Sequence, residues 1–476
     1  MNTIDRFLID SCKANPEKLA LIDGDSKFTF LELEEKVMKF SSFVNQFEEK
    51  SVISLLFENT SELVISYLGI INSGCVAHLI PTGISQSNLQ HQILSAQPKL
   101  ILSSDSYLSK VKDIELENLE KLKFSDVKEI SSKNNTPSPT DYAYLIYTSG
   151  TTSTPKGVPI THSSCDFSTK NIAKTLDYSQ NDIDLLPLQM SHSFGLGCLH
   201  TSLYVGSTLV LQKNPKPMDI LESIKKYNVT TLAAIPSTLS NIVSNYYDHS
   251  SNSLSNLRLI ITNSTFFPPE TIRKLRSMLK TGIVATYYGL TEASRSTFMI
   301  FNDDKKIESV GKPSDGVEIK IDTKIKNDDI GEIWIRGSNV LGNYWKKEYS
   351  ENKSDDWLKT GDLGKFDDDG FLYILGRVDD LINISGEKVY PQEIERIVKV
   401  LSGIDEVVAI PMKHKSFGEV VKLFVKKSPN SEITSEDILV HCIKNLERFK
   451  VPAKIEFIED FPRTDYGKIK RFMLKE

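Results

Sequence analysis

The sequence lacks the cysteine patterns that build a disulfide framework or a structural zinc site. Its five cysteines are scattered along the chain at Cys12, Cys75, Cys165, Cys198 and Cys442, and no two of them form a C-x-x-C pair. Isolated cysteines are typical of proteins from a reducing compartment. The sequence therefore predicts a cytoplasmic protein.

The sequence also lacks an excess of positive charge. It carries 57 lysines and arginines against 63 aspartates and glutamates, which gives a formal net charge of −6. A nucleic-acid-binding domain gathers basic residues on one face, so nucleic acid is not an expected partner. The 476 residues are enough for two to four domains, at roughly 100–200 residues per domain.

Signal-peptide and membrane-span patterns are missing as well. Residues 1–18, MNTIDRFLIDSCKANPEK, have neither the basic start nor the long apolar run of a signal peptide. The most apolar stretch, residues 63–80, is interrupted by Asn72, Ser73 and Gly74, whereas a transmembrane helix needs about 20 consecutive apolar residues. We expect this stretch to form a buried helix, a turn and a buried strand.

Short apolar runs alternate with amphipathic segments over most of the chain. Such alternation predicts an α/β fold with largely parallel sheets and helical crossovers, in more than one layered unit. Ligands of such sheets bind where the strands end and the loops begin. The expected strands are 51–57, 75–81, 99–104, 230–236, 257–263 and 282–288.

The pattern changes after about residue 300. Residues 309–337 are punctuated by glycine and alternate apolar with polar residues, which predicts a small antiparallel, β-barrel-like unit. The last part of the chain has its own α+β pattern. We therefore predict an N-terminal domain over residues 1–378 and a small C-terminal domain over 379–476. The elements expected in the C-terminal domain are a helix at 391–401, strands at 407–412 and 420–427, and a helix at 435–446.

A hydroxyl-rich segment follows one predicted strand. The apolar residues 144–147 lead into a run of Thr, Ser and Gly (148–154), and Lys156 and Gly157 follow shortly after. Backbone N–H groups in such a turn form a concave nest for anions, and a lysine adds a mobile positive charge. The Walker pattern does not fit, because Lys156 precedes its glycine. By itself the segment predicts a phosphate loop and a Ser/Thr-rich surface turn about equally well.

Four further stretches place chemically versatile side chains together. Tyr288 can stack on a base, and Thr291 with Glu292 offers the hard oxygen ligands that suit Mg²⁺. Asp362 is flanked by glycines, so we expect a tight turn whose carboxylate suits two ribose hydroxyls. Arg377 offers a planar guanidinium for ribose or phosphate oxygens, and Lys468 follows a glycine. Taken singly, such residues also suit a helix cap, a charged linker or a solvated tail.

In this order, the five stretches resemble the adenylate-forming superfamily of acyl-CoA synthetases, peptide-synthetase adenylation domains and luciferases. The resemblance covers essentially the whole chain. The family loop reads Y-T-S-G-T-T-G-x-P-K-G, and residues 147–157 match it except at Ser153, which replaces a glycine. Each motif is moderately specific, and the five collinear motifs together are specific to the family.

The resemblance implies a role for each motif residue. Lys468 would bridge the substrate carboxylate and the α-phosphate, Thr291 would contact phosphate, and Glu292 would coordinate Mg²⁺. Asp379 would lie at the hinge of a mobile C-terminal domain. The other expected nucleotide and cofactor contacts are Thr148, Ser149, Gly150, Thr151, Thr152, Lys156, Tyr288, Gly289, Asp362, Arg377 and Gly386.

The implied activity is that of an AMP-forming acid–thiol ligase, with ATP, Mg²⁺ and coenzyme A as cofactors. ATP would convert a small-molecule carboxylic acid to an acyl-AMP with release of pyrophosphate, and a thiol would then displace AMP. Segment 187–197 resembles the substrate side of the family, where His192 and Phe194 are candidates and His192 is also a candidate catalytic residue. The alternative for both is a packed turn in the core. No aspartate in this segment pairs an amine, which disfavours a free α-amino acid.

A second pocket segment, glycine-rich in many relatives, carries side chains here. Asn263, Ser264 and Thr265 would narrow the pocket and make it more polar. We therefore expect a small or polar acid rather than a long fatty chain.

Other functions stay open at this point. A carrier protein's phosphopantetheine arm presents the same thiol as coenzyme A, so an acyl carrier protein is an alternative partner. A luciferase-like oxygenase shares the motifs. A nucleotide-binding interaction protein with an inactive site is the non-enzyme alternative, although Lys468, Glu292 and Asp362 are all present. The sequence gives no oligomeric state.

Overall fold

The chain folds into two compact units. The computed structural model describes residues 2–128, 136–148, 155–213, 215–246, 253–263, 267–323, 329–346, 353–385, 387–415, 417–464 and 469–474. The first unit comprises Met1–Glu318 with Ile335–Leu358, and the second comprises Ile319–Trp334 with Lys359–Glu476. This confirms the predicted mixed α/β class with a large N-terminal and a small C-terminal part. The boundary predicted between residues 378 and 379 concerns domain motion and stays a prediction.

The first unit contains two mainly parallel sheets. Among the described residues, the larger sheet has nine strands, and its central strands β9, β10, β11, β12 and β13 are parallel to their neighbours, while β14 is antiparallel to β13. Parallel strands end at the same edge of a sheet, so the loops after β9, β12 and β13 meet there. In sheet order the strands are β15 (Lys312–Pro313), β14 (Ala293–Ile300), β13 (Ile283–Leu290), β12 (Leu259–Thr262), β11 (Thr231–Ala233), β9 (Ile183–Leu186), β10 (Thr208–Leu211), β1 (Leu19–Asp23) and β2 (Ser26–Thr29).

The second sheet carries the hydroxyl-rich segment. Its strands are parallel except at one edge, where β7 and β8 form an antiparallel pair. All six strands expected from apolar runs are confirmed within the two sheets. In sheet order the second sheet has β6 (Glu120–Lys123), β5 (Leu100–Ser103), β3 (Val52–Leu56), β4 (Val76–Leu79), β7 (Tyr142–Thr148) and β8 (Lys156–Thr161).

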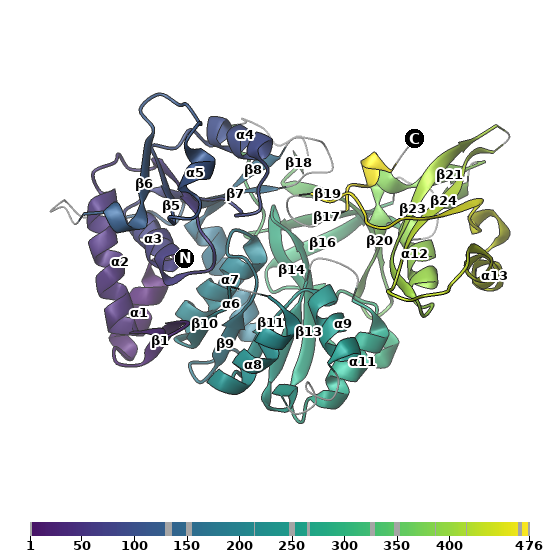
Figure 1. Cartoon of the computed structure of the whole chain (residues 1–476), viewed down its shortest axis with the longest axis horizontal. Coiled ribbons are helices and arrows are strands. Elements are labelled where there is room, and N and C mark those ends of the chain that lie inside the picture. Colours follow the sequence, from purple (N-terminus) through teal and green to yellow (C-terminus); the bar gives the residue numbers. More distant parts are fainter. Residues whose placement is uncertain are drawn as a thin grey trace. The chain divides into compact units, whose positions relative to one another are not determined.

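Helices cover the sheets of the first unit. Helices α8, α9 and α11 pack beside β9 and β13 on one face of the nine-stranded sheet, as Figure 1 shows, while α6 contacts β14 and α7 contacts β9 and β10. The stretch 63–80 folds as predicted, into α3, a turn and β4, and no helix in the described ranges is long and apolar enough to cross a membrane. The helices are α1 (Arg6–Ala14), α2 (Phe30–Val44), α3 (Ser61–Asn72), α4 (Gln86–Ala96), α5 (Leu108–Val111), α6 (His162–Thr175), α7 (Ser193–Val205), α8 (Pro217–Tyr227), α9 (Pro236–Asn245) and α11 (Pro269–Met278).

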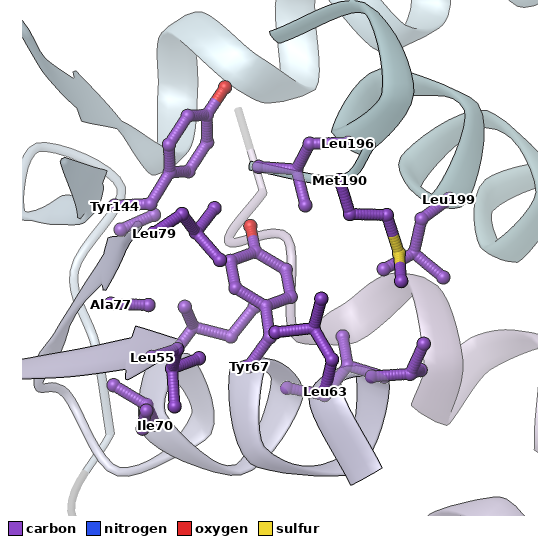
Figure 2. Close-up of a cluster of buried hydrophobic side chains, with 14 of the residues drawn as sticks. Leu55, Leu63, Tyr67, Ile70, Ala77, Leu79, Tyr144, Met190, Leu196 and Leu199 are labelled. Atoms are coloured by element: carbon purple, nitrogen blue, oxygen red, sulfur yellow. The ribbon is translucent and has the colours of Figure 1, made fainter. Parts of the chain in front are cut away.

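The main core draws on both sheets. Tyr67 from α3 and Tyr144 from β7 lie among aliphatic side chains that include Leu79 and Leu196 (Figure 2). The Tyr67 hydroxyl lies 2.7 Å from Nε2 of His200, so this buried polar group has a partner. Burial of these side chains fixes α3 and α7 against the sheets, because each fully buried large apolar side chain contributes about 1.5–3 kcal/mol.

The remaining strands, with the exception of β25, are antiparallel where their pairing is described. Five strands between residues 317 and 377 form one sheet, with β16 (Val317–Asp322), β17 (Gly331–Gly337), β19 (Trp357–Phe366) and β18 (Lys353–Ser354) in that order and β20 (Leu372–Arg377) paired to β19. The expected C-terminal α+β pattern is also confirmed. Its elements are β21 (Ile382–Ile384), β22 (Glu387–Val389), α12 (Pro391–Lys399), β23 (Ile404–His414), β24 (Gly418–Lys427), α13 (Ser435–Asn445) and β25 (Lys454–Phe457), where β25 alone is parallel to its neighbour β24.

Candidate active site

The hydroxyl-rich segment connects the paired strands β7 and β8. Thr148 and Lys156 face each other in the ladder, and Tyr147 faces Gly157. The Thr148 hydroxyl lies 3.5 Å from the carbonyl oxygen of Lys156. Both ends of the loop are therefore fixed by the sheet. The predicted phosphate-binding residues Ser149, Gly150, Thr151 and Thr152, and also Ser153, lie outside the described residues.

The exit of this loop is closely packed. The carbonyl oxygen of Pro155 lies 3.0 Å from Nε2 of His91, and Gly157 accepts a hydrogen bond of 2.9 Å from the backbone N–H of Trp345. A Cβ atom at Gly157 would lie 2.9 Å from Cβ of Trp345, which is too close for any other residue without movement of the backbone. Glycine is therefore required where Trp345 packs against the start of β8.

The turn between β13 and β14 presents Thr291 and Glu292. These two residues form the hairpin loop, because Leu290 pairs directly with Ala293. Gly289 lies beside the returning strand, and a Cβ atom there would lie 2.6 Å from the backbone nitrogen of Arg295. Tyr288 donates its backbone N–H to Oγ1 of Thr297 at 3.2 Å. The predicted adenine-side and metal-side residues thus share one hairpin end.

Tyr344 connects the two motifs. Its hydroxyl donates to Oε1 of Glu292 at 3.1 Å, and Nζ of Lys156 lies 5.2 Å from the centre of its ring. Lys156 and Glu292 therefore contact one buried tyrosine, Lys156 at its ring and Glu292 at its hydroxyl. Sequence reasoning missed Tyr344, because its only local signal is an aromatic pair in the segment GNYW.

Glu292 is the candidate metal ligand in this part of the site. The described residues hold no cluster of three or more His, Cys, Asp or Glu side chains that would form a complete metal cage. A single half-buried carboxylate beside a threonine hydroxyl instead fits Mg²⁺, which is usually held by one or two carboxylates together with phosphate and water oxygens. The donor set therefore fits a metal that arrives with a nucleotide.

The predicted substrate residues follow the carboxyl ends of neighbouring strands. His192 is the N-cap residue of α7, and Phe194 lies in its first turn, with 8% of its surface exposed. Phe194 packs edge-on against Tyr287 at 5.4 Å between ring centres. Asn263 follows β12 and hydrogen-bonds the Tyr287 side chain. Phe194 and Asn263 therefore meet at Tyr287, while Ser264 and Thr265 lie outside the described residues.

The ribose-binding candidates lie together in the second unit. Asp362 of β19 and Arg377 at the end of β20 are ladder partners, and Nη1 of Arg377 donates to Oδ1 of Asp362 at 3.0 Å. The expectation of a tight turn at Asp362 was wrong, because the residue lies inside the strand Trp357–Phe366. Gly361 adopts a left-handed φ of +71° without ending the strand, and a Cβ atom there would lie 2.8 Å from Nη2 of Arg377.

The guanidinium of Arg377 is only partly used. Its Nε is buried and has no partner among the described residues. Buried donors normally have an acceptor, and a ribose oxygen of a bound nucleotide would supply one. Asp379 is exposed in the short 3-10 helix Val378–Asp380 that follows. Gly386 and Lys468 lie outside the described residues, although their flanks are described: β21 pairs with β22, and Arg463 pairs with Ile469.

Together, these features are those of a nucleotide-binding α/β protein. The chain belongs to the AMP-binding enzyme family: the family model matches residues 8–345, and the model of the AMP-binding enzyme C-terminal domain matches residues 393–468.

Several characterised relatives span nearly the whole chain. A 2-succinylbenzoate–CoA ligase from Bacillus licheniformis is 30% identical and is covered over 98% of both proteins. An oxalate–CoA ligase from Arabidopsis thaliana is 29% identical, over 99% of this chain and 97% of the plant protein. The o-succinylbenzoate CoA synthetase of Bacillus subtilis, solved with its acyl-adenylate intermediate, has a TM-score of 0.90 at 27% identity, over 99% and 98% of the two chains. It has also been solved with ATP and a magnesium ion.

Proposed function

We propose that this chain is an AMP-forming acid–CoA ligase. In the first step a carboxylate oxygen attacks the α-phosphorus of ATP, an acyl-AMP anhydride forms and pyrophosphate leaves. In the second step the sulfur of coenzyme A attacks the acyl carbon, AMP leaves and the thiol proton is released. The thioester, AMP and pyrophosphate are the products.

The observation that carries this proposal is the arrangement around Tyr344. The stem of the hydroxyl-rich loop and the β13–β14 turn belong to different sheets, yet Lys156 and Glu292 approach the same tyrosine. A triphosphate needs positive charge and a metal-binding carboxylate close together, and these two side chains supply them. The relatives that act on acids with coenzyme A span nearly the whole chain, which supports the same assignment.

The residue roles follow from this arrangement. Lys156 and the loop residues 148–152 would hold the β- and γ-phosphates, Tyr288 and Gly289 would flank the adenine, and Thr291 would contact phosphate. Such positioned donors act chiefly by stabilising charge that develops on the phosphoryl oxygens. Bound Mg²⁺ at Glu292 would neutralise part of that charge.

The second unit would supply the ribose and switching contacts. Asp362 and Arg377 would bind the ribose, since they already form a joined donor–acceptor pair. Lys468 would neutralise charge between the acid and the α-phosphate in the first step, and the loop at Gly386 would replace it in the second. Asp379 would act as the hinge between the domains predicted over 1–378 and 379–476.

The acid is proposed to be small or polar. Asn263 and Phe194 both contact Tyr287 and would border the acyl group together with His192, Ser264 and Thr265. Coenzyme A is the proposed acceptor because the relatives named above are CoA ligases. A phosphopantetheine arm on a carrier protein is the alternative acceptor, and it would show itself as thioester formation with a carrier but not with free coenzyme A.

ATP–pyrophosphate exchange tests the first step. The acids compared are 2-succinylbenzoate, oxalate, and short aliphatic, hydroxy, amino and long-chain acids, each with purified full-length protein and Mg²⁺. We expect exchange with a small or polar acid and weak exchange with palmitate. Silence with every acid, or release of ADP in place of AMP, would contradict the proposal. Better activity on palmitate than on C3–C6 acids would contradict only the proposed acid class.

A pair of glutamate variants controls for non-specific effects. Glu292→Gln keeps the size of the side chain and removes the proposed metal-binding charge, so exchange should fall by about 100- to 1,000-fold. Glu318→Gln removes a surface carboxylate whose partner is Arg336, and exchange should continue at the wild-type rate. Equal rates in both variants would exclude Glu292 from the site.

A further inference from the structure

Arg295 is a buried arginine whose charge is largely unpaired within the described part of the chain. The residue is 6% exposed, and no carboxylate of the described residues forms an ion pair with it. Its Nη1 donates to Oγ of Ser294 at 3.0 Å, whereas Nε and Nη2 are buried without a partner among the described residues. Buried guanidinium groups are normally paired, because an unpaired charge in the interior is costly.

Four titratable side chains near Arg295 cannot act as its counter-ion. The ring of Tyr287 lies 5.5 Å from the guanidinium carbon, and burial raises the pKa of Tyr287 to about 12. Burial likewise raises the pKa of the nearby thiols Cys165 and Cys198 to about 12. Burial, together with the charge of Arg295, lowers the pKa of His200 to about 3. At neutral pH these four side chains are uncharged, and Arg295 carries the only charge among them.

The backbone holds Arg295 in an unfavourable conformation. Between Ala293 and Thr297 strand β14 bulges opposite Gly289, and Arg295 adopts a left-handed φ of +56°. Bulges of this kind redirect a side chain and are frequent beside binding sites.

Each of the three bulge residues, Ser294, Arg295 and Ser296, is held by a hydrogen bond from another segment. Asn339 Nδ2 donates to the Ser294 carbonyl and to Ser296 Oγ, each at 3.0 Å. Ser314 Oγ donates to the Arg295 carbonyl at 2.7 Å. The strained residue is therefore held in place by its surroundings.

A glycine in α7 makes room for the guanidinium. Any Cβ atom at Gly197 would overlap Nη2 of Arg295. Gly197 lies one turn beyond Phe194 in the same helix, and Tyr287 contacts both Phe194 and Asn263. The guanidinium thus lies among the residues proposed to border the acyl group.

We propose that Arg295 determines substrate specificity by pairing with a second anionic group of the acid, so that the substrate class is dicarboxylates and related dianionic acids. This inference rests on the proposed function and deepens it. A carboxylate accepts two parallel hydrogen bonds from a guanidinium fork, and Nε with Nη2 forms the unoccupied edge of that fork in the described part of the chain. The acid's other carboxylate remains the one joined to AMP.

Matched acids test this proposal. Each pair differs in one charge: 2-succinylbenzoate against 4-oxo-4-phenylbutanoate, succinate against succinamate, and oxalate against oxamate. Exchange rates give kcat/KM, and calorimetry gives the Kd of each acid for the enzyme with and without ATP. We expect the diacid to exceed its matched monoacid in both measurements for at least one pair. Equal kcat/KM and equal Kd in all pairs would overturn the proposal.

Arg295 variants connect the preference to the residue. In Arg295→Met the ratio of diacid to monoacid should fall roughly 10- to 100-fold, the size expected for one lost hydrogen bond to a charged group. Arg295→Lys retains the charge without the fork and should lose less. A wild-type ratio in Arg295→Met would overturn the proposal.

Two further measurements distinguish a specificity role of Arg295 from a structural role: the Tm of Arg295→Met, and the effect of Gly197→Ala on the ratio of diacid to monoacid. Arg295→Met removes an unpaired buried charge, so Tm should not fall. If Arg295→Met lowers Tm and leaves the ratio of diacid to monoacid unchanged, Arg295 stabilises the fold and does not determine specificity. Gly197→Ala should lower the ratio in the wild-type background and have no further effect in Arg295→Met. An equal effect in both backgrounds would contradict the contact.

The binding measurement distinguishes the two proposals. Diacid binding that weakens in Arg295→Met, in an enzyme without exchange activity, would support the specificity role and contradict the ligase. Exchange with acids of any charge, at ratios unaffected by Arg295→Met, would support the ligase and contradict the specificity role.

Discussion

The nine-stranded sheet has an amino edge, where its parallel strands begin, and a carboxyl edge, where they end. The arginines at these two edges have different hydrogen-bond partners. At the amino edge, Arg258 precedes β12 and donates from Nε and Nη2 to both oxygens of Asp182, at 2.6 Å each. Asp182 also accepts from the Thr230 hydroxyl and the Ser179 backbone N–H. At the carboxyl edge, Arg295 has no such carboxylate among the described residues. At the amino edge the paired arginine contributes stability. At the carboxyl edge the Nε and Nη2 donors of Arg295, which are unpaired in the described part of the chain, are available for a ligand.

The largest expected effect is on catalysis at the carboxyl edge. Glu292→Gln should lower the exchange rate by about 100- to 1,000-fold, because one charge-stabilising group at a reacting phosphate contributes that much. Its free energy of unfolding should change by less than about 0.5 kcal/mol, as for a substitution away from the core. Exchange assays and urea unfolding measure the two quantities. If Glu292→Gln lowered stability as well as activity, the carboxyl edge would also contribute to stability and would not differ from the amino edge in this respect.

The amino edge should show the opposite pattern. Arg258→Met leaves the buried carboxylate of Asp182 unpaired, so the free energy of unfolding should fall by about 3 kcal/mol. The exchange rate per folded molecule should stay at the wild-type value, since Arg258 lies at the far end of the strands. Urea titration and exchange on the same preparations check this. Unchanged stability would show that the ion pair contributes nothing.

The two edges should also respond to acid in different pH ranges. Burial, with the charge of Arg295, lowers the folded-state pKa of His200 from 6.5 to about 3. Between these values only the unfolded chain binds the proton, so stability should fall as the pH drops, by about 1.4 kcal/mol per pH unit for one histidine. His200→Gln should reduce the slope of unfolding free energy against pH by that amount between pH 6 and pH 4. An unchanged slope would show that His200 titrates normally.

The carboxyl group of Asp182 affects stability in a more acidic pH range. Burial would raise its pKa, but the hydrogen bonds from Arg258 and Ser179 outweigh this and hold the pKa below 3.8. A carboxyl with a lowered pKa stabilises the fold above its unfolded-state value, and this contribution is lost as the pH falls below about 3.8. Arg258→Met removes the strongest of the groups that lower this pKa, so the folded-state pKa of Asp182 should rise and the loss of stability below pH 4 should become flatter.

The smallest effect concerns the link between the two motifs. Tyr344→Phe removes only the hydroxyl that donates to Glu292, so exchange should slow roughly 3- to 10-fold, about the net value of one typical hydrogen bond. Tyr373→Phe removes a comparable hydroxyl in the second unit, where it donates to Asp367, and provides the matched control. Equal rates for the two variants would contradict a positioning role for Tyr344.

Elements with a strong apolar pattern were predictable from the sequence. The strand expected at 257–263 is β12, Leu259–Thr262, and the helix expected at 435–446 is α13, Ser435–Asn445. Burial on both faces of a parallel strand requires a continuous apolar run, and such a run is visible locally. The turn expected at Asp362 was wrong for a local reason as well: glycine at 361 indicated a turn, whereas the left-handed Gly361 lies within a continuous strand.

The contacts between distant segments were not predictable in this way. Tyr344 reaches Glu292 across 52 positions of sequence, and Asn339 clamps the bulge at Ser294 across 45. Nothing in the local pattern of either segment indicates its partner. The importance of Arg295 likewise depends on the absence of a carboxylate among its described neighbours, which only the fold reveals. The roles of all the motif residues stay predictions, and Lys468, Gly386 and residues 149–152 lie outside the described residues.

The products of one complete turnover test the central claim most directly. Purified protein would be incubated with ATP, Mg²⁺, coenzyme A and the acid that gives the strongest exchange, and nucleotides and thioester would be quantified together by mass spectrometry. An acid–CoA ligase produces AMP and acyl-CoA in equal amounts and requires all three substrates. Formation of ADP, or of AMP without any thioester to coenzyme A, would contradict the account.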